Sequence, residues 1–327
     1  MHRSILDCNL VDPWKDLVTD LGNVTLRGYD TSTYLTGKFA NPISSKSVRA
    51  LSVGDIAHDH CETRRDLYQK KGTNPAFHRG PRSTWSMIAG IVVEGYIMQL
   101  KTSDLHGPPM NFSKIKERAA NLTQSFKLSN GRQVRKLWSH RDESSTDPNK
   151  LIRSLELNAR AEIFALMSSR LCPQFNLRAR HIKFKEEVHP HPAEVGISDP
   201  SVPDFLIPNF GIVGDIKTGM NFLDIFLATC AGYAVAYENE KGKGNDIDFG
   251  VCYFFQTRWD SEYSKTVTFA QPHIFAIDDT LRSYFIDLRD RAYEIVTKNT
   301  PPPFPADKSK CPFCPYLDGC TRDGLTL

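Results

Sequence analysis

The chain has 327 residues, 40% of them hydrophobic and 24% charged, a composition typical of globular proteins and unlike that of disordered, collagen-like or coiled-coil chains. Because 41 basic residues face 38 acidic ones, the net charge is only +3 and bulk charge does not indicate a nucleic-acid-binding protein. No apolar run approaches the roughly 18 residues that span a bilayer, and the start lacks the apolar core of a signal peptide. We therefore expect a cytoplasmic protein that does not contact membranes.

The predicted elements divide the chain into four parts. Residues 1–50 are polar and irregular, and residues 51–175 are predicted to be a helical region. The strands fall within residues 176–278, and residues 279–327 contain a helix followed by a cluster of cysteines. Several helices followed by a run of strands and a further helix indicate a mixed α/β core with an α-helical elaboration in front of it.

In chain order, Ser52 is the expected N-cap of a first helix that carries Cys61 and ends near Lys71, before Gly72. The helices expected after it cover residues 83–100, 113–129, 149–170, 221–237 and 279–298. The expected strands cover residues 180–188, 202–207, 211–216 and 249–255, with a last strand pair at 267–269 and 273–277.

Charged residues gather at the ends of two neighbouring predicted strands. Asp204 stands at the head of one strand, and Asp215 and Lys217 come at the end of the next. Residues two apart on a strand project from the same face, so Asp215 and Lys217 are expected to lie together. Pairing of the two strands would bring Asp204 alongside them and place two carboxylates and one ammonium at one point.

This group of charges suits a divalent cation. Mg²⁺ and Mn²⁺ prefer oxygen ligands and commonly take one or two carboxylates, water and a substrate phosphate. Asp204, Asp215 and the carbonyl of Ile216 could hold one such ion, which could activate water for attack on a phosphodiester. Lys217 could then orient that water or stabilise the phosphate. The alternative is a simple surface ion pair between an aspartate and a lysine at a strand end.

Three of the eight cysteines lie close together near the C-terminus. Cys311, Cys314 and Cys320 have the spacing C-x₂-C-x₅-C, and Cys61 is the best candidate for a fourth thiolate. In a reducing compartment such a cluster more often binds metal than forms disulfides. Four thiolates suit structural zinc and an iron–sulfur cluster equally, so the spacing leaves both open.

Taken together, these motifs resemble the RecB-like branch of the PD-(D/E)xK nuclease superfamily. Pro203-Asp204 is similar to its second motif and Asp215-Ile-Lys217 to its third. One early cysteine and three late ones around such a core resemble its iron–sulfur nucleases. Over roughly residues 50–322 the chain is most similar to the CRISPR-associated Cas-four-like family, in its archaeal Csa branch.

The resemblance implies a restriction-endonuclease-like mixed sheet and an iron–sulfur clasp, a [4Fe–4S] cluster that joins the N- and C-terminal regions. It also implies further site residues. Tyr233 is similar to the tyrosine that positions DNA in the family, although Thr229 stands where the family has glutamine. Gly90 and Glu94 resemble the first motif with glutamate in place of histidine, so Glu94 is implied as a metal ligand. Of the acids before the second motif, we favour Glu187 as the one that faces the site.

The function implied is a metal-dependent DNA nuclease of the exonuclease type that trims DNA ends during CRISPR spacer acquisition. Single-stranded or end-bearing DNA and CRISPR integrase proteins are the implied partners. One alternative is a DNA repair or recombination exonuclease. A second is a catalytically weak subunit that binds DNA ends for an integrase, which the altered first and last motifs favour. A third is an interaction module stapled by zinc.

Overall fold

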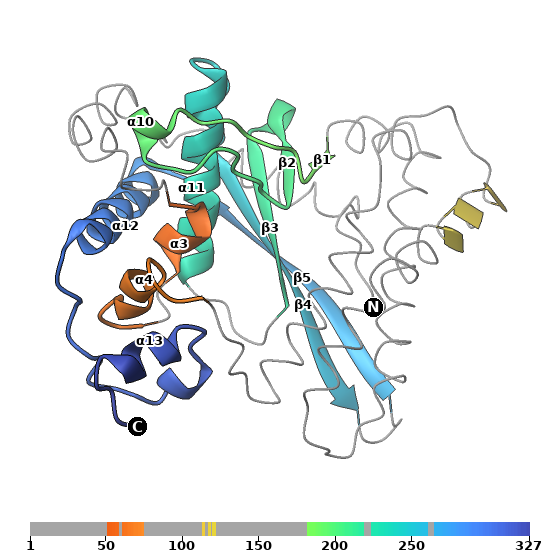
Figure 1. Cartoon of the computed structure of the whole chain (residues 1–327). Helices are drawn as coiled ribbons and strands as arrows, with labels where there is room; N and C mark the ends of the chain where they lie inside the picture. Colours follow the sequence, from red (N-terminus) through yellow and green to blue (C-terminus); the bar gives the residue numbers. More distant parts are fainter. Residues whose placement is uncertain are drawn as a thin grey trace.

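The computed structural model describes residues 51–58, 61–74, 113–114, 117–118, 120–121, 182–218, 224–260 and 265–327. Within them the chain forms a five-stranded mixed sheet with helices packed against it, which confirms the mixed α/β prediction (Figure 1). The predicted segment 1–50 and the predicted helices at 83–100 and 149–170 lie outside the described residues.

The strands lie across the sheet in their chain order. They are β1 (Lys183–Phe184), β2 (Phe205–Ile207), β3 (Ile212–Thr218), β4 (Phe249–Asp260) and β5 (Lys265–Ala276). Neighbours are antiparallel except β3 and β4, which are parallel. A parallel pair needs a long crossover connection, and helix α11 (Asp224–Lys241) occurs in the connection between these two strands.

Several predicted strands are wrong in extent, and β4 ends at Asp260 rather than at residue 255. The last strand pair is a single strand, β5, which pairs with β4 along its whole length. Pro272 lies within β5, which is at the edge of the described sheet, and prolines within sheets occur mainly on such edge strands. The strand expected at 180–188 is reduced to β1, because Lys185 adopts a left-handed backbone (φ 48°) that ends it.

Helix α11 lies between the sheet and the other helices. It packs on β3 and β4 on one side and on α3 (Val53–Ala57) and α12 (Asp279–Thr297) on the other. The small residues along α11 permit this close approach: a Cβ added to Gly232 would lie only 2.5 Å from the ring of Phe285. A helix surrounded by protein is expected to be apolar on several faces, as α11 is.

The helix predicted from Ser52 to Lys71 is two short helices, α3 and α4 (Arg65–Gln69). The predicted cap is confirmed, since Ser52 Oγ accepts a hydrogen bond of 3.1 Å from the Asp55 amide. Cys61 lies in a turn before α4 rather than within a helix, which corrects the prediction.

The remaining elements are short. They are α10 (Pro192–Val195), the 3₁₀ turns η3 (Pro208–Phe210) and η4 (Cys311–Phe313), and α13 (Leu317–Arg322). Helix α13 lies beside α4, so the two ends of the described chain meet (Figure 1). In the part of the chain that the structure describes, no helix has the length and hydrophobicity to cross a membrane.

A buried ion pair fixes α12 against α11. Arg282 is 2% exposed and donates to Glu238 Oε1 at 2.8 Å and to the carbonyl of Ile247 at 2.8 Å. The other carboxylate oxygen of Glu238 lies 3.3 Å from Arg282 Nε. Charges buried in this way stabilise a fold only when both partners are present, because the loss of one leaves the other unpaired.

We therefore expect Arg282→Ala to lower the free energy of unfolding by about 3–5 kcal/mol, because Glu238 would stay buried without its guanidinium partner. Chemical denaturation followed by circular dichroism measures this. Arg291→Ala, at an exposed position of the same helix, controls for the change in helix propensity and should cost less than about 1 kcal/mol. Equal losses in the two variants would contradict a stabilising role for the buried pair.

Candidate functional site

The registers of three strands place charged residues in one row across the sheet. Phe205 of β2 lies opposite Gly214 of β3, so the preceding residue, Asp204, falls opposite Asp215. On the other side of β2 the ladder continues to Lys185, whose amide donates a 3.0 Å hydrogen bond to the Asp204 carbonyl. Side chains opposite one another on antiparallel strands share a face and lie within contact distance. The predicted meeting of Asp204 with Asp215 and Lys217 is therefore present.

Packing beside the two aspartates fixes this register. The ring of Phe205 lies over Gly214, where an added Cβ would come within 1.9 Å of the ring. Any larger residue at position 214 would displace Phe205. A slip of β2 by one residue would turn Phe205 away and carry Asp204 to the opposite face of the sheet.

Asp215 and Lys217 form a close and largely buried ion pair. Asp215 Oδ2 lies 2.6 Å from Lys217 Nζ, with side-chain exposures of 4% and 31%. Burial raises the pKa of Asp215 to about 7, against the opposing effect of Lys217 and with a further contribution from Asp204. Burial acts to lower the pKa of Lys217, but the charge and hydrogen bond of Asp215 outweigh it and raise that pKa above its ordinary value.

Asp204 is held from two sides. Its Oδ2 accepts a 2.5 Å hydrogen bond from the amide of Ile216, and its Oδ1 forms an ion pair with Lys185. Since the N–H and C=O of one residue in a strand point to the same side, the carbonyl of Ile216 faces the side on which Asp204 lies. Asp204, Asp215 and this carbonyl are the three ligands proposed from the sequence.

These groups fit a divalent cation. Asp215 Oδ2 is buried, and the ammonium of Lys217 lies 2.6 Å from it. A carboxylate has more lone pairs than one ammonium engages, so Asp215 can also coordinate a cation. Asp204 is also buried. Its carboxylate, that of Asp215 and the carbonyl of Ile216 lie together at the end of a strand. Such a set matches the oxygen ligands of Mg²⁺ and Mn²⁺.

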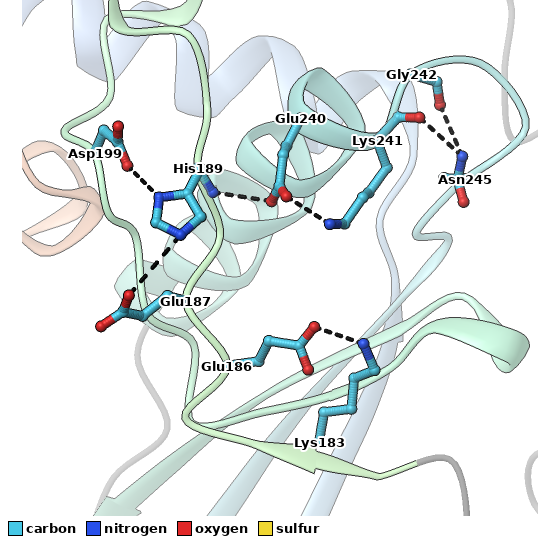
Figure 2. A network of polar contacts seen from close by, with 9 residues as sticks. All are labelled: Lys183, Glu186, Glu187, His189, Asp199, Glu240, Lys241, Gly242 and Asn245. Carbon is cyan, nitrogen blue, oxygen red and sulfur yellow. Dashed lines mark hydrogen bonds and ion pairs between the residues drawn. The ribbon is translucent and has the colours of Figure 1, made fainter.

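The prediction that Glu187 faces the site is wrong. Figure 2 shows Glu187 beside His189, with 3.8 Å between Glu187 Oε2 and His189 Nε2, while Glu186 pairs with Lys183 at 2.5 Å. The left-handed turn at Lys185 explains the error, because it breaks the alternation on which the choice of Glu187 rested. Lys185 was not predicted from the sequence as a site residue, yet it lies opposite Asp204 in the row of charged residues across the sheet.

The segment between Lys185 and Asp204 is anchored to the end of α11. The His189 amide donates to Glu240 Oε2 at 2.9 Å, and the His189 ring bonds to Asp199 Oδ1 at 2.7 Å (Figure 2). The hydrogen bond to Asp199 raises the pKa of His189. These contacts tie the segment that leads into β2 to the end of α11.

The structure describes some of the other predicted site residues but not all of them. Tyr233 is partly buried and packs against the hydrophobic core, one turn beyond Cys230 on α11. The hydroxyl of Thr229 donates to the carbonyl of Ile225 at 2.8 Å within the helix. Glu94 lies outside the described residues. A contact of Tyr233 or Glu94 with DNA or metal stays a prediction.

The four cysteines predicted to act together line one cavity. Its volume is about 330 Å³, and its walls include Cys61, Cys311, Cys314 and Cys320. Burial raises the pKa of the Cys311 and Cys320 thiols and raises that of Cys314 to about 12. The Tyr316 amide points at Cys314 Sγ, 3.4 Å away. Amide–sulfur hydrogen bonds of this kind tune metal–thiolate clusters.

Interactions between α4 and the C-terminal segment hold together the two parts of the chain that line this cavity. Arg65 is 4% exposed, pairs with Asp323, and has its guanidinium 4.1 Å from the ring centre of Phe304. Gly319 of α13 packs so closely that an added Cβ would lie 2.4 Å from Gln69 Oε1. The position of Cys320 therefore depends on α4, although α4 precedes it by some 250 residues in the chain.

Four thiols around one cavity fit a metal–thiolate group in the donor atoms they supply. A single tetrahedral zinc needs sulfurs at about 2.3 Å from the metal. Among the described residues, no group of three or more Cys, His, Asp or Glu side chains is arranged around a single ion. The cavity has more room than one zinc ion requires.

Comparison with known proteins identifies the family of this chain. Residues 34–322 match the protein family described as CRISPR-associated exonuclease Csa1. The chain belongs to this family. It is also 33% identical over 112 residues to the CRISPR-associated exonuclease Csa1 of Saccharolobus solfataricus. That alignment covers 34% of this chain and 35% of the relative, so it spans about a third of the relative's length.

The raised pKa of Asp215 predicts how the stability of this Csa1-family chain depends on pH. Asp215 has a pKa of about 7 in the folded protein against an ordinary value of 3.8, so the folded state binds the extra proton between these pH values. Stability from this group is present below about pH 4 and is lost as the pH rises through about 7, by on the order of a few kcal/mol.

We expect thermal unfolding of the protein in chelator to show this loss of stability with rising pH, and Asp215→Asn to reduce it, because the amide has no proton to release. Asp246→Asn changes an exposed acid and is the matched control. If Asp215→Asn followed the same pH dependence as the wild type, the carboxyl would not be the group responsible.

Proposed function

We propose that this chain is a divalent-metal-dependent DNA nuclease of the exonuclease type, with a PD-(D/E)xK core and a structural [4Fe–4S] cluster. We propose further that it processes DNA ends in CRISPR spacer acquisition, together with integrase proteins. The observation that carries the proposal is the meeting of Asp204, Asp215 and Lys217 at one strand end, in a chain of the Csa1 family.

Each residue of the site has its own role in phosphodiester hydrolysis. Asp204, Asp215 and the Ile216 carbonyl would hold a Mg²⁺ or Mn²⁺ ion, and Glu94 would be a further ligand. When bound, that ion lowers the pKa of water and offsets charge on the phosphate. Lys217 donates hydrogen bonds to the attacking water or to a phosphate oxygen, because its raised pKa keeps it protonated at neutral pH. Tyr233 positions the DNA.

The overall reaction needs no further reagent. The oxygen of a water molecule forms a bond to phosphorus, and the phosphorus–oxygen bond to the neighbouring nucleotide breaks. One proton of the water passes to bulk solvent, and the leaving oxygen takes up another. Burial of Asp215 beside Lys217 excludes much of the competing water and strengthens the electrostatic interactions of the site.

One observation favours a catalytically weak, DNA-end-binding subunit as the second candidate. Thr229 stands where the resembled family has glutamine, and its hydroxyl already bonds to the Ile225 carbonyl. A hydroxyl that donates its proton within its own helix has no donor left for a phosphate, unlike the amide of a glutamine. Such a subunit would bind DNA with salt sensitivity but without turnover.

To test the proposal, anaerobically purified protein is incubated with end-labelled single- and double-stranded DNA in Mn²⁺ or in chelator. We expect cleavage only with Mn²⁺. Asp215→Ala and Lys217→Ala should each reduce the rate by about a hundredfold or more, because a metal ligand or a charge on the transition state is lost. Glu187→Gln, which alters an exposed acid outside the site, is the matched control and should keep the wild-type rate.

Metal-independent cleavage, or cleavage that survives in Asp215→Ala, would contradict the proposed site. Salt-sensitive DNA binding that is shared by all variants, with no cleavage by any of them, would support the DNA-end-binding subunit instead. The alternative function, a DNA repair exonuclease, is tested separately by examining which genes lie next to this one in its genome.

For the cysteine cavity we expect a brown protein that contains about four iron and four sulfide per chain. Cys314→Ser and Cys320→Ser should lose the iron and the visible absorption, because each removes one of four thiolates. Cys252→Ala, a buried cysteine in the sheet, is the control and should retain both. A colourless protein with one zinc per chain would contradict the iron–sulfur proposal and support a zinc site.

A further inference from the structure

Lys185 has a position that neither its sequence context nor the proposed mechanism explains. It adopts a left-handed backbone with φ 48°, which glycine or asparagine adopts more readily than lysine. Backbone outliers of this kind concentrate at functional sites, so the side chain of Lys185 is a candidate for a functional role.

The side chain of Lys185 reaches Asp204, one of the proposed metal ligands. The main chain already occupies Asp204 Oδ2 through the amide of Ile216, at 2.5 Å, while the Lys185 ammonium is paired with Oδ1. Oδ1 is thus the oxygen of Asp204 that a side chain rather than the main chain holds, and a cation can displace that side chain. A divalent ion at Asp204 must compete with the ammonium.

The exposures of the two side chains indicate from which side Lys185 reaches Asp204. Its side chain is 37% exposed, whereas that of Asp204 is 9% exposed, so the lysine enters the site from the solvent side. Lys217, by contrast, lies beside Asp215 and above the ring of Phe226, with Nζ 5.6 Å from the ring centre. Both lysines are partly exposed, but Lys217 is also held against the ring of Phe226, so we take Lys185 as the one that changes partner.

We propose that Lys185 is a substrate-binding residue that exchanges partners. In the metal-free protein its ammonium is paired with Asp204 Oδ1. When a divalent cation takes this oxygen, Lys185 turns outward and binds a backbone phosphate of the DNA. This inference rests on the proposed nuclease function.

The charges at the site account for such an exchange. Without metal, two aspartates are balanced by two lysines, since Lys185 pairs with Asp204 and Lys217 with Asp215. A divalent ion adds two positive charges and repels the ammonium nearest to it. The phosphodiester backbone supplies the negative charge that Lys185 then lacks, and a lysine–phosphate contact has no sequence preference.

The test compares Lys185→Met with Lys183→Met. Lys183 lies two residues away on β1 and pairs with Glu186 at 2.5 Å, so the control removes the same charge outside the site. Mn²⁺ affinity is measured by electron paramagnetic resonance of the free ion. DNA affinity is measured by fluorescence anisotropy over a range of salt concentrations, in Ca²⁺ to prevent cleavage.

We expect Lys185→Met to bind Mn²⁺ about two- to fivefold more tightly than the wild type, because a partly exposed ion pair no longer competes. Its slope of log affinity against log salt should fall by about 0.7–0.9, the value of one phosphate contact. Lys183→Met should match the wild type in both. Lys185→Gly, which adopts φ 48° freely, should behave as Lys185→Met and serves if that variant fails to fold.

A Lys185→Met protein that keeps either the wild-type Mn²⁺ affinity or the wild-type salt slope overturns the proposal. Weaker Mn²⁺ binding would also overturn it, since it would mean that Lys185 only holds Asp204 in place. Failure of the nuclease proposal looks different: the wild type would neither cleave DNA with Mn²⁺ nor lose Mn²⁺ binding on Asp215→Asn.

Discussion

The burial of two aspartates next to each other is the constraint on which the site depends. Asp204 and Asp215 face one another across β2 and β3, and two unpaired carboxylates at this distance would repel strongly out of water. Each is therefore paired with a lysine, and Asp204 also accepts an amide hydrogen bond. The packing of Phe205 on Gly214 keeps this balance in register, since a slip would separate the pairs.

Helix α11 joins this charged site to the rest of the molecule. Its side toward the sheet carries Cys230, whose sulfur lies 3.9 Å from that of Cys252, the residue opposite Asp215 on β4. Its last turns hold the segment before Asp204 through Glu240 and hold α12 through Glu238. The strands of the site and the helices leading to the cysteine cavity are thus positioned by the same helix, so distortion of α11 would affect both.

Much of this arrangement follows from the sequence, for local reasons. The apolar runs of β3 and β4, the cap of α3 at Ser52 and the spacing of Asp215 and Lys217 each reflect neighbours within a few residues. The errors in the prediction arise where contacts between residues far apart in the sequence determine the local structure. Lys185 turns left-handed and breaks strand alternation, and Pro272 continues a strand because that strand lies at the described edge of the sheet. Neither condition is encoded in its own neighbourhood.

The cysteine cavity shows how contacts between distant segments prepare a metal site. Joining Cys61 to Cys311 closes a loop of roughly 250 residues, at an entropic cost of about 5 kcal/mol. Arg65, Tyr68 and Gln69 of α4 already bond to the C-terminal segment before any thiolate is bridged. Protein contacts thus meet part of that cost in advance. A cluster bound there would reinforce an existing junction, and its loss should loosen the two ends of the chain before it disturbs the sheet and the aspartates.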